Sequence, residues 1–331
     1  MSKLLEIKDL KAQYVTNDAV YYALNGVSLD INEGEVLGLV GETGAGKTTT
    51  AFSIMQLLPK DVGFITGGSI LFNGSDVIGM PESGLRKIRG SQMSMIFQDP
   101  MTSLNPVLTV GKQIGEALEF HSSGSKSEIE EQVDEILTLV GIPPSRKNEF
   151  PHQFSGGMKQ RVVIAMALIC KPKLLIADEP TTALDVTVQK QVLNLMLGLK
   201  DKLNTSMLLI THDLGIVAQT CDRVAIMYAG EIIEKGSVFD IFNSKDNLRH
   251  PYTQGLFGSL PSLQENSRRL KPIDGLMPDP ADLPGGCKFH TRCPVREDKC
   301  SIEIPDEYEI YGHTIKCHLY TGNNSMKEGT E

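Results

Sequence analysis

A glycine-rich segment near the N-terminus carries residues suited to phosphate chemistry. Residues 41–48 are Gly-Glu-Thr-Gly-Ala-Gly-Lys-Thr, which matches the pattern G-x-x-x-x-G-K-[ST]. Its glycines let the backbone turn its N–H groups toward phosphate oxygens, Lys47 can reach the β- and γ-phosphates, and the Thr48 hydroxyl is a suitable Mg²⁺ ligand. We therefore predict a P-loop that binds a nucleoside triphosphate. The residues predicted to contact this nucleotide are Gly41, Glu42, Thr43, Gly44, Ala45, Gly46, Lys47, Thr48 and Thr49.

Two carboxylates follow another apolar run. Residues 174–177 are Leu-Leu-Ile-Ala, and Asp178 and Glu179 come directly after them. A carboxylate at the carboxyl end of a parallel strand lies beside the nucleotide in this topology. Asp178 can hold Mg²⁺ through its water shell, and Glu179 can polarise a water for attack on the γ-phosphate. Alone, such a pair is more often a helix cap or a solvated loop, but beside a P-loop we interpret it as catalytic.

The spacing of apolar residues predicts the elements that position these groups. Short buried strands are expected at residues 36–40, 93–97, 174–177 and 207–210, and helices at 49–58, 128–140 and 188–203. Alternating strands and helices indicate an α/β, doubly wound parallel sheet. We also expect a small antiparallel flank at 14–33, and a hairpin at 225–234 that turns at Ala229 and Gly230.

Composition narrows the class of protein. The 331 residues carry 41 acidic and 32 basic side chains, and a net charge of −9 argues against a dedicated nucleic-acid binder. No apolar run reaches the roughly 20 residues that span a bilayer. The N-terminal sequence MSKLLEIKDL lacks the pattern of a signal peptide, so we expect the six cysteines to be thiols in a reducing cytosol.

The chain changes character near residue 250. Beyond it the sequence is rich in proline and loses helical periodicity, and four cysteines cluster there, separated by 5, 6 and 16 residues. We predict a first domain over 1–250 and a small irregular Cys-rich domain over 251–331. Structural zinc usually shows closer cysteine pairs, whereas wider gaps suit a [4Fe–4S] cluster; zinc, free thiols and disulfides remain alternatives. The predicted ligands are Cys287, Cys293, Cys300 and Cys317, with His290, His313 and His318 as nearby substitutes.

Further motifs point to a family. Residues 154–158, Phe-Ser-Gly-Gly-Met, resemble the signature motif of ATP-binding cassette (ABC) ATPases, usually written LSGGQ. Gln98 resembles the family's Q-loop glutamine, 183–185 resembles its D-loop, and His212 its switch histidine. The resemblance covers roughly residues 3–250. It implies an ATPase with a P-loop NTPase core, an antiparallel β flank and a helical subdomain at about 98–170.

The resemblance also implies roles at the site. Gln98 would contact Mg²⁺ and report nucleotide occupancy, and His212 would contact the γ-phosphate and help orient the water. ABC ATPases pair head to tail, and the residues implied to contact the ATP of the opposite subunit are Ser155, Gly156, Gly157 and Asp185. Adenine would stack on an aromatic residue near the N-terminus; the resemblance favours Tyr14, with Tyr22 as the alternative. Met158 stands where the signature motif usually has glutamine, so a polar role of that side chain is lost here.

A closer likeness concerns transport. Residues 154–168 and the segment 250–253, His-Pro-Tyr-Thr, resemble the D-type ATPase subunit of bacterial dipeptide and oligopeptide importers. This implies a peripheral protein at the cytoplasmic face of the membrane, two permease subunits, an F-type ATPase partner or a second copy, and indirectly a peptide-binding protein. Nickel importers have similar ATPases. The apolar residues proposed to dock a permease helix, or else to form subdomain core, are Met101, Leu104, Pro106, Val107 and Leu108.

Two other classes of protein compete with this reading. A soluble ABC ATPase in DNA repair or translation often has tandem cassettes, long coiled-coil insertions or basic arms, and none is recognised in this sequence. A P-loop kinase for a small molecule would not need the segment 155–157 or the Q-loop. The sequence therefore favours an importer ATPase.

Overall fold

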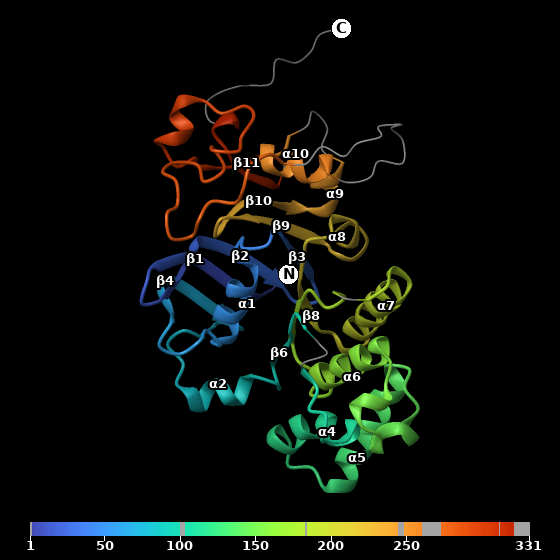
Figure 1. Ribbon diagram of the computed structural model, residues 1–331. Coiled ribbons are helices and arrows are strands. Elements are labelled where there is room, and N and C mark those ends of the chain that lie inside the picture. The colour runs from blue at the N-terminus through green and yellow to red at the C-terminus, as the bar shows by residue number, and fades with distance from the viewer. Residues whose placement is uncertain are drawn as a thin grey trace.

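The computed structural model describes residues 2–99, 103–182, 184–243, 248–259, 273–310 and 312–320. These residues form two β-sheets with helices around them (Figure 1). Met101 and Ala183, which belong to two of the predicted motifs, lie outside the described residues.

The first sheet is antiparallel and has the strand order β2-β1-β4-β5. Its strands are β1 (Lys3–Val15), β2 (Val20–Asn32), β4 (Gly63–Phe72) and β5 (Ser75–Asp76). One face supplies apolar side chains such as Leu5, Ile7 and Ile70 to the core, because alternate residues of a strand point to the same side. The predicted antiparallel flank is present, but it begins at Lys3 and includes β4 and β5, which the predicted range of 14–33 missed.

The second sheet holds the predicted parallel strands. Its order is β11-β12-β10-β9-β3-β8-β7-β6, and the run from β9 to β6 is parallel. The parallel strands are β3 (Val36–Val40), β6 (Met93–Ile96), β7 (Leu174–Asp178), β8 (Ser206–Thr211) and β9 (Arg223–Tyr228). The four predicted strands differ from these by no more than one residue at an end. Helices cover both faces of a parallel sheet, so its strands are buried on both sides. This explains why the strands are continuous apolar runs.

The predicted hairpin is also present. It joins β9 to β10 (Glu231–Ser237), and both turn residues have positive φ, +46° at Ala229 and +78° at Gly230. A two-residue turn of this kind matches the twist of the flanking strands.

Helices connect the strands and differ slightly from prediction. The helix after the P-loop, α1 (Lys47–Met55), begins two residues earlier than expected, and Gln56 with φ +51° ends it. The helix predicted at 128–140 is α5 (Lys126–Leu139), which starts early because Ser125 and Glu128 form a capping box. The other helices are α2 (Glu82–Ile88), α4 (Val110–His121), α6 (Gly156–Leu168), α7 (Val186–Leu203), α8 (Leu214–Thr220), α9 (Val238–Phe242) and α10 (Pro251–Gly258).

Three of these helices form a group inside the predicted helical region. α4, α5 and α6 lie together at the lower end of Figure 1 and contact one another. Their shared core includes Ile114, Leu118, Val133, Leu137 and Val162. Whether residues 98–170 form a separate subdomain, and whether a domain boundary lies at 250, stay predictions.

The C-terminal part is more ordered than the sequence suggested. Two short strands, β11 (Glu307–Ile310) and β12 (His313–Lys316), extend the main sheet, because β12 pairs with β10. The ring of Phe289, which is 2% exposed, packs against Tyr228 and Tyr252 with centroids 5.2 and 5.4 Å apart. These residues are far apart in the sequence, so local periodicity could not reveal their contact.

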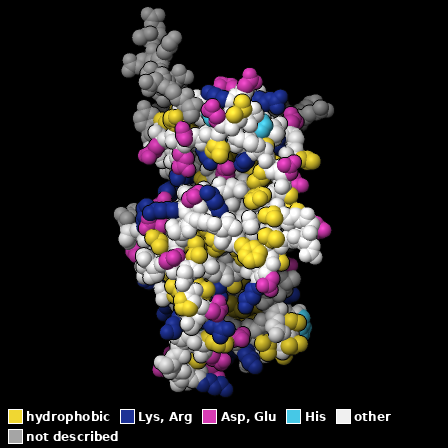
Figure 2. All heavy atoms as spheres, turned by 90° about the vertical axis from the view of Figure 1, so that its left-hand side faces the viewer, with side chains coloured by type: hydrophobic (Ala, Val, Ile, Leu, Met, Phe, Trp, Pro, Cys, Tyr) yellow, Lys and Arg dark blue, Asp and Glu magenta, His cyan; other side chains and the backbone are white. Residues whose placement is uncertain are grey.

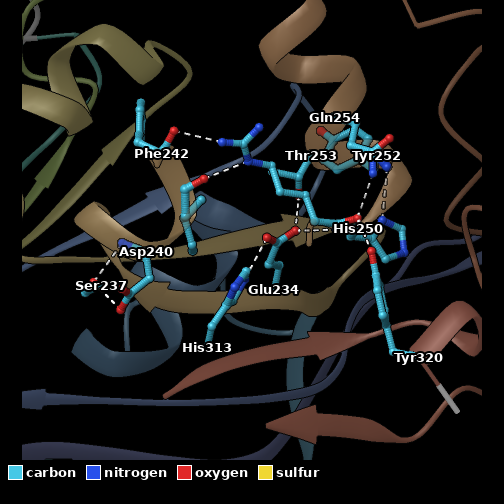
Figure 3. Close-up of polar contacts among 12 residues, drawn as sticks. Glu234, Ser237, Asp240, Phe242, His250, Tyr252, Thr253, Gln254, His313 and Tyr320 are labelled. Atoms are coloured by element: carbon cyan, nitrogen blue, oxygen red, sulfur yellow. Dashed lines mark hydrogen bonds and ion pairs between the residues drawn. The ribbon is translucent and has the colours of Figure 1, made fainter. Parts of the chain in front are cut away.

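A buried carboxylate joins the C-terminal strands to α10 (Figure 3). Glu234 in β10 is 1% exposed and accepts hydrogen bonds from the backbone N–H of His250 at 2.9 Å and from the Thr253 hydroxyl. Its other oxygen lies 2.7 Å from Nε2 of His313 in β12. One side chain thus links three elements.

Two further features are the distribution of surface charge and the length of the helices. On the face shown in Figure 2, acidic and basic side chains of the described residues are interspersed. Within the described ranges, no helix combines the length and the apolar character needed to cross a bilayer.

Candidate active site

The P-loop connects β3 to α1 and is closely packed. Gly46 has φ +106°, and a Cβ at this position would lie 2.7 Å from the carbonyl oxygen of Ala23. A Cβ on Gly41 would lie 2.3 Å from the carbonyl oxygen of Met227. Both distances are too short for any side chain, so the fold around the loop requires glycine at these two positions.

Lys47 points into the loop that it follows. Its Nζ donates to the carbonyl oxygens of Gly41, at 2.8 Å, and Glu42, at 3.0 Å, and the residue is 6% exposed. Burial lowers the pKa of Lys47, while the nearby carboxylates of Glu179, Asp178 and Glu42 act in the opposite direction. The ammonium group is therefore inside the loop, where phosphate oxygens could replace the two carbonyls.

The two predicted magnesium-binding elements meet at the start of α1. The Thr48 hydroxyl donates to Oδ2 of Asp178 at 2.7 Å. Asp178 ends β7 and is 1% exposed, and this burial raises its pKa. A hydroxyl and a carboxylate are oxygen ligands of the type that Mg²⁺ prefers, so the donor set fits this ion.

Glu179 brings three predicted motifs together. Its Oε1 lies 3.1 Å from Nδ1 of His212, and its Oε2 accepts hydrogen bonds from the Thr182 hydroxyl at 3.0 Å and from Nε2 of Gln98 at 3.5 Å. Burial acts to raise the pKa of Glu179, but the contacts with His212 and Thr182 outweigh it, so the pKa is lowered overall. The ionised carboxylate can orient a water and accept its proton.

The backbone at Glu179 is unusual. Its φ is +46°, a left-handed conformation that non-glycine residues rarely adopt. Its N–H bonds to the carbonyl oxygen of Ile210 at 2.9 Å, at the end of the neighbouring strand β8. The fold thus holds this side chain at the carboxyl edge of the parallel sheet.

The two candidates for adenine stacking have different surroundings. The Tyr14 hydroxyl lies 3.2 Å from Oγ1 of Thr49, in the first turn of α1. Tyr22 is 47% exposed, and its N–H bonds to the carbonyl oxygen of Pro280. Of the two tyrosines, Tyr14 is the one whose side chain contacts α1 in the described part of the chain. Its stacking on adenine stays a prediction.

The residues expected to meet another subunit begin two helices. The Ser155 hydroxyl caps α6 by accepting from the N–H of Met158 at 3.4 Å, and Ser155 and Gly156 are exposed. Asp185 caps α7 by accepting from the N–H groups of Thr187 and Val188. Gly157 follows in α6. Asp185 is therefore the N-cap of α7, and its contact with the ATP of the opposite subunit stays a prediction.

The C-terminal part supplies two P-loop contacts that sequence reasoning missed. The Tyr252 hydroxyl accepts from the N–H of Glu42 at 3.0 Å. Arg292 donates to both carboxylate oxygens of Glu42, at 2.8 and 3.2 Å. Tyr252 lies in the segment 250–253 that carries the family likeness, but that likeness assigned it no contact, and Arg292 belongs to no motif. Only the three-dimensional structure reveals that they approach residue 42.

The four C-terminal cysteines line one cavity of about 20 Å³, together with His250, Phe289, His290 and His318. Burial raises the pKa of Cys287 to about 11 and of Cys317 to about 12, and the other cysteines reinforce both shifts. Yet the described part of the chain contains no group of three or more His, Cys, Asp or Glu that could hold a metal ion. The four cysteines therefore share one cavity, but in this conformation the described residues do not form a metal-binding group. His313 instead pairs with Glu234.

The proposed docking residues have different environments. Leu104 is 6% exposed and belongs to the core of the helical region, as the alternative interpretation expected. Val107 is 75% exposed. Leu104 therefore cannot line a free groove in this conformation, while Val107 can reach a partner.

Comparison with known proteins identifies the family. Residues 24–182 match the family model described as ABC transporter, and residues 233–300 match the oligopeptide/dipeptide transporter C-terminal region. The dipeptide transport ATP-binding protein DppD of Bacillus subtilis is 50% identical over 322 residues, covering 96% of this chain and 95% of that protein. The chain belongs to the ABC transporter ATPases.

Other relatives agree with this assignment. The oligopeptide transport ATP-binding protein AppD of Bacillus subtilis is 48% identical over 323 residues, 97% of this chain and 98% of that protein. The dimeric structure of an ATP-binding cassette bound to ADP and Pi has a TM-score of 0.63 at 28% identity, over 71% of this ATPase and 98% of that chain. Structure and sequence thus confirm the predicted ABC ATPase fold, and the P-loop kinase alternative is excluded.

Proposed function

We propose that this ATPase hydrolyses ATP to power the import of dipeptides or oligopeptides through membrane subunits. The observation that carries the proposal is the convergence of Gln98 and His212 on Glu179, beside the P-loop. The peptide cargo is inferred from relatives that are named as dipeptide and oligopeptide transport proteins, and from the match of residues 233–300.

The proposed chemistry divides between the residues that activate water and those that bind the phosphates and Mg²⁺. Glu179 orients the attacking water and accepts its proton, and His212 holds that carboxylate in place and would contact the γ-phosphate. Lys47 neutralises charge on the β- and γ-phosphates. Mg²⁺, when bound, neutralises developing charge on the phosphate oxygens, and Thr48 and Asp178 are the residues that would hold it, with Gln98 nearby.

The hydrolysis cycle is proposed to involve a second ATPase subunit. The exposed N-terminus of α6 presents the Ser155 hydroxyl and the backbone amides of Gly156 and Gly157, which suit a phosphate of another subunit's ATP. Asp185 would contact the same interface. We propose an F-type partner, with the homodimer as alternative. The ATPase would lie at the cytoplasmic face of the membrane, bound to two transmembrane permease subunits.

Uptake measurements test the proposed transport. In cells that lack their own copy of this gene, the wild-type chain should restore uptake of a radiolabelled dipeptide or oligopeptide. The Glu179→Gln variant should fail to restore uptake but still copurify with the membrane subunits. Restored uptake of radioactive nickel without peptide uptake would overturn the peptide assignment, and ATP turnover that responds to DNA or ribosomes would overturn the transport role.

We also propose that Cys287, Cys293, Cys300 and Cys317 hold a [4Fe–4S] cluster. The support is their convergence on one cavity from four separate positions in the chain. Four thiolates around a single zinc ion must lie about 3.8 Å from one another. The four thiolates of a [4Fe–4S] cluster lie farther apart, because each binds a different iron atom. The cavity has room for about one water molecule, so these segments would have to move apart to admit the cluster.

Spectroscopy tests the cluster. Protein purified without oxygen should show a broad violet-to-blue absorbance that oxygen bleaches. The Cys293→Ser variant should lose this absorbance. The control is Cys170→Ser, which should keep it, because Cys170 lies in the turn after α6 and does not line the cavity. A colourless protein with one zinc per chain would overturn the cluster in favour of zinc.

A further inference from the structure

The most direct link between the C-terminal part and the nucleotide site is the ion pair of Arg292 and Glu42. Both Nη atoms of Arg292 donate to the carboxylate, in the two-pronged geometry that makes arginine pairs strong and directional. The side chain of Arg292 is 5% exposed and that of Glu42 is 27% exposed. The pair is thus shielded from the water that weakens surface ion pairs.

Arg292 is itself fixed by several partners. Its Nε donates to the carbonyl oxygen of Asp274 at 3.0 Å, and its Nη1 lies 3.5 Å from the Tyr228 hydroxyl. The guanidinium carbon also lies 5.8 Å from the centre of the Tyr228 ring. A side chain held from three directions can hold its own partner in one place.

Glu42 is held at three points, each by a different residue. Tyr252 contacts its backbone N–H, Lys47 its carbonyl oxygen, and Arg292 its carboxylate. Movement of Glu42 would therefore displace a carbonyl that contacts the ammonium group of Lys47. Its charge matters too, because a carboxylate within a phosphate-binding loop repels phosphate unless a cation neutralises it.

We propose that Arg292 is a positioning residue for nucleotide binding, which acts through Glu42 to hold the P-loop in its phosphate-binding conformation and to neutralise its carboxylate. The C-terminal segment thereby sets the nucleotide affinity of the same chain. This inference rests on the proposed ATP site at residues 41–48. It does not require a metal group at the cysteines.

The test is the dissociation constant of MgADP, measured by calorimetry on the full chain. Arg292→Met should raise this constant by about 10-fold to 100-fold, because a displaced and uncompensated P-loop carboxylate opposes phosphate binding. Arg292→Lys keeps the charge but loses the two-pronged geometry, so it should give an intermediate value.

A double-mutant cycle shows whether Arg292 acts through Glu42. In a Glu42→Gln background, Arg292→Met should change the constant by less than about twofold, since the partner charge is already gone. A purely structural role would weaken binding equally in both backgrounds, and that result would overturn the proposal. So would a folded Arg292→Met variant with wild-type affinity.

The chain offers a matched control in Lys316. Like Arg292, it directly precedes one of the clustered cysteines and pairs with a carboxylate of the cassette, Glu231 in β10, at 2.5 Å. Because Glu231 is outside the P-loop, Lys316→Met should leave the MgADP constant within about twofold of wild type. An increase equal to that of Arg292→Met would contradict a specific role for Arg292.

Two further variants keep the test decisive. If Arg292→Met does not fold, Arg292→Lys must raise the constant in the wild-type chain but not in the Glu42→Gln background; an equal increase in both overturns the proposal. The Lys47→Met variant tests whether residues 41–48 bind the nucleotide at all, and it should abolish MgADP binding. Normal binding by that variant would overturn the P-loop assignment itself, a failure distinct from that of Arg292.

Discussion

Oε1 of Glu179 lies 3.1 Å from Nδ1 of His212, although 33 residues separate them in the chain. The two residues follow the neighbouring strands β7 and β8, whose carboxyl ends meet at one edge of the sheet. This pairing fixes the carboxylate beside the P-loop, and its lowered pKa keeps it ionised at neutral pH. The geometry makes Glu179 the residue on which turnover should depend most.

Replacing Glu179 should separate nucleotide binding from hydrolysis. Glu179→Gln keeps the shape of the side chain but removes the basic oxygen, so we expect kcat to fall by at least about 100-fold. The dissociation constant of MgATP should stay within about threefold of wild type, because the P-loop is unchanged. Steady-state phosphate release and equilibrium binding measure the two quantities. Glu33→Gln, at an exposed turn, is the control, and near-normal hydrolysis by Glu179→Gln would refute the assigned role.

Thr48 should control the magnesium requirement. Thr48→Val preserves the shape of the side chain but removes the hydroxyl that contacts Asp178. We expect the Mg²⁺ concentration for half-maximal ATPase activity to rise about tenfold, since one oxygen ligand is lost. A Mg²⁺ titration at saturating ATP measures this change. Thr138→Val in α5 removes a hydroxyl that bonds only within its helix and should leave the titration unchanged; an unchanged Thr48→Val titration would contradict the prediction.

Much of this site could be predicted because its parts are local in sequence. The P-loop, Asp178 and Glu179 each follow an apolar strand, and parallel strands bring their carboxyl ends together without further information. The convergence of Gln98 and His212 on Glu179 is consistent with the family motifs. Capping residues such as Ser125 even marked helix starts more accurately than apolar periodicity did.

The C-terminal contacts could not be predicted in this way. Arg292 and Glu42 are 250 residues apart, and the strands β11 and β12 are only four residues long, with no long apolar run. β12 joins the main sheet by pairing with β10, about 80 residues earlier in the chain, and no local pattern encodes this contact. The prediction of an irregular tail therefore missed both its strands and its contact with the P-loop.

Cys221 should resist alkylation in the folded protein. Burial raises the pKa of its thiol to about 12, well above the roughly 8.5 of an ordinary exposed cysteine. At pH 8.5 the reactive thiolate should therefore be about 1,000-fold scarcer in the folded state. Because the folded pKa is raised, the stability that the neutral thiol contributes is present below about pH 8.5 and is lost as the pH rises toward 12.

Iodoacetamide labelling followed by peptide mass spectrometry measures this protection. The labelling rate of Cys221 at pH 8.5 should rise by about three orders of magnitude when urea unfolds the chain. The same peptide in urea provides the control for intrinsic reactivity. Equal rates in the folded and unfolded chain would show that the thiol is neither buried nor perturbed.

Glu234 should determine how firmly the C-terminal part is attached. It is buried and contacts α10 and β12 at once, through His250, Thr253 and His313. Glu234→Ala leaves these groups without their acceptor, so we expect the free energy of unfolding to fall by about 3–5 kcal/mol. Glu234→Gln keeps one acceptor oxygen and should cost less. Denaturant unfolding measures both values.

Limited proteolysis separates local detachment from global loss of stability. In Glu234→Gln, cleavage within residues 273–320 should accelerate more than cleavage within the parallel sheet, because the lost contacts join those residues to β10. Glu309→Gln on the exposed side of β11 removes a carboxylate from the same region without these contacts and should leave the cleavage pattern unchanged. Uniform acceleration at all sites in Glu234→Gln would show that Glu234 stabilises the whole fold and does not act as a local attachment.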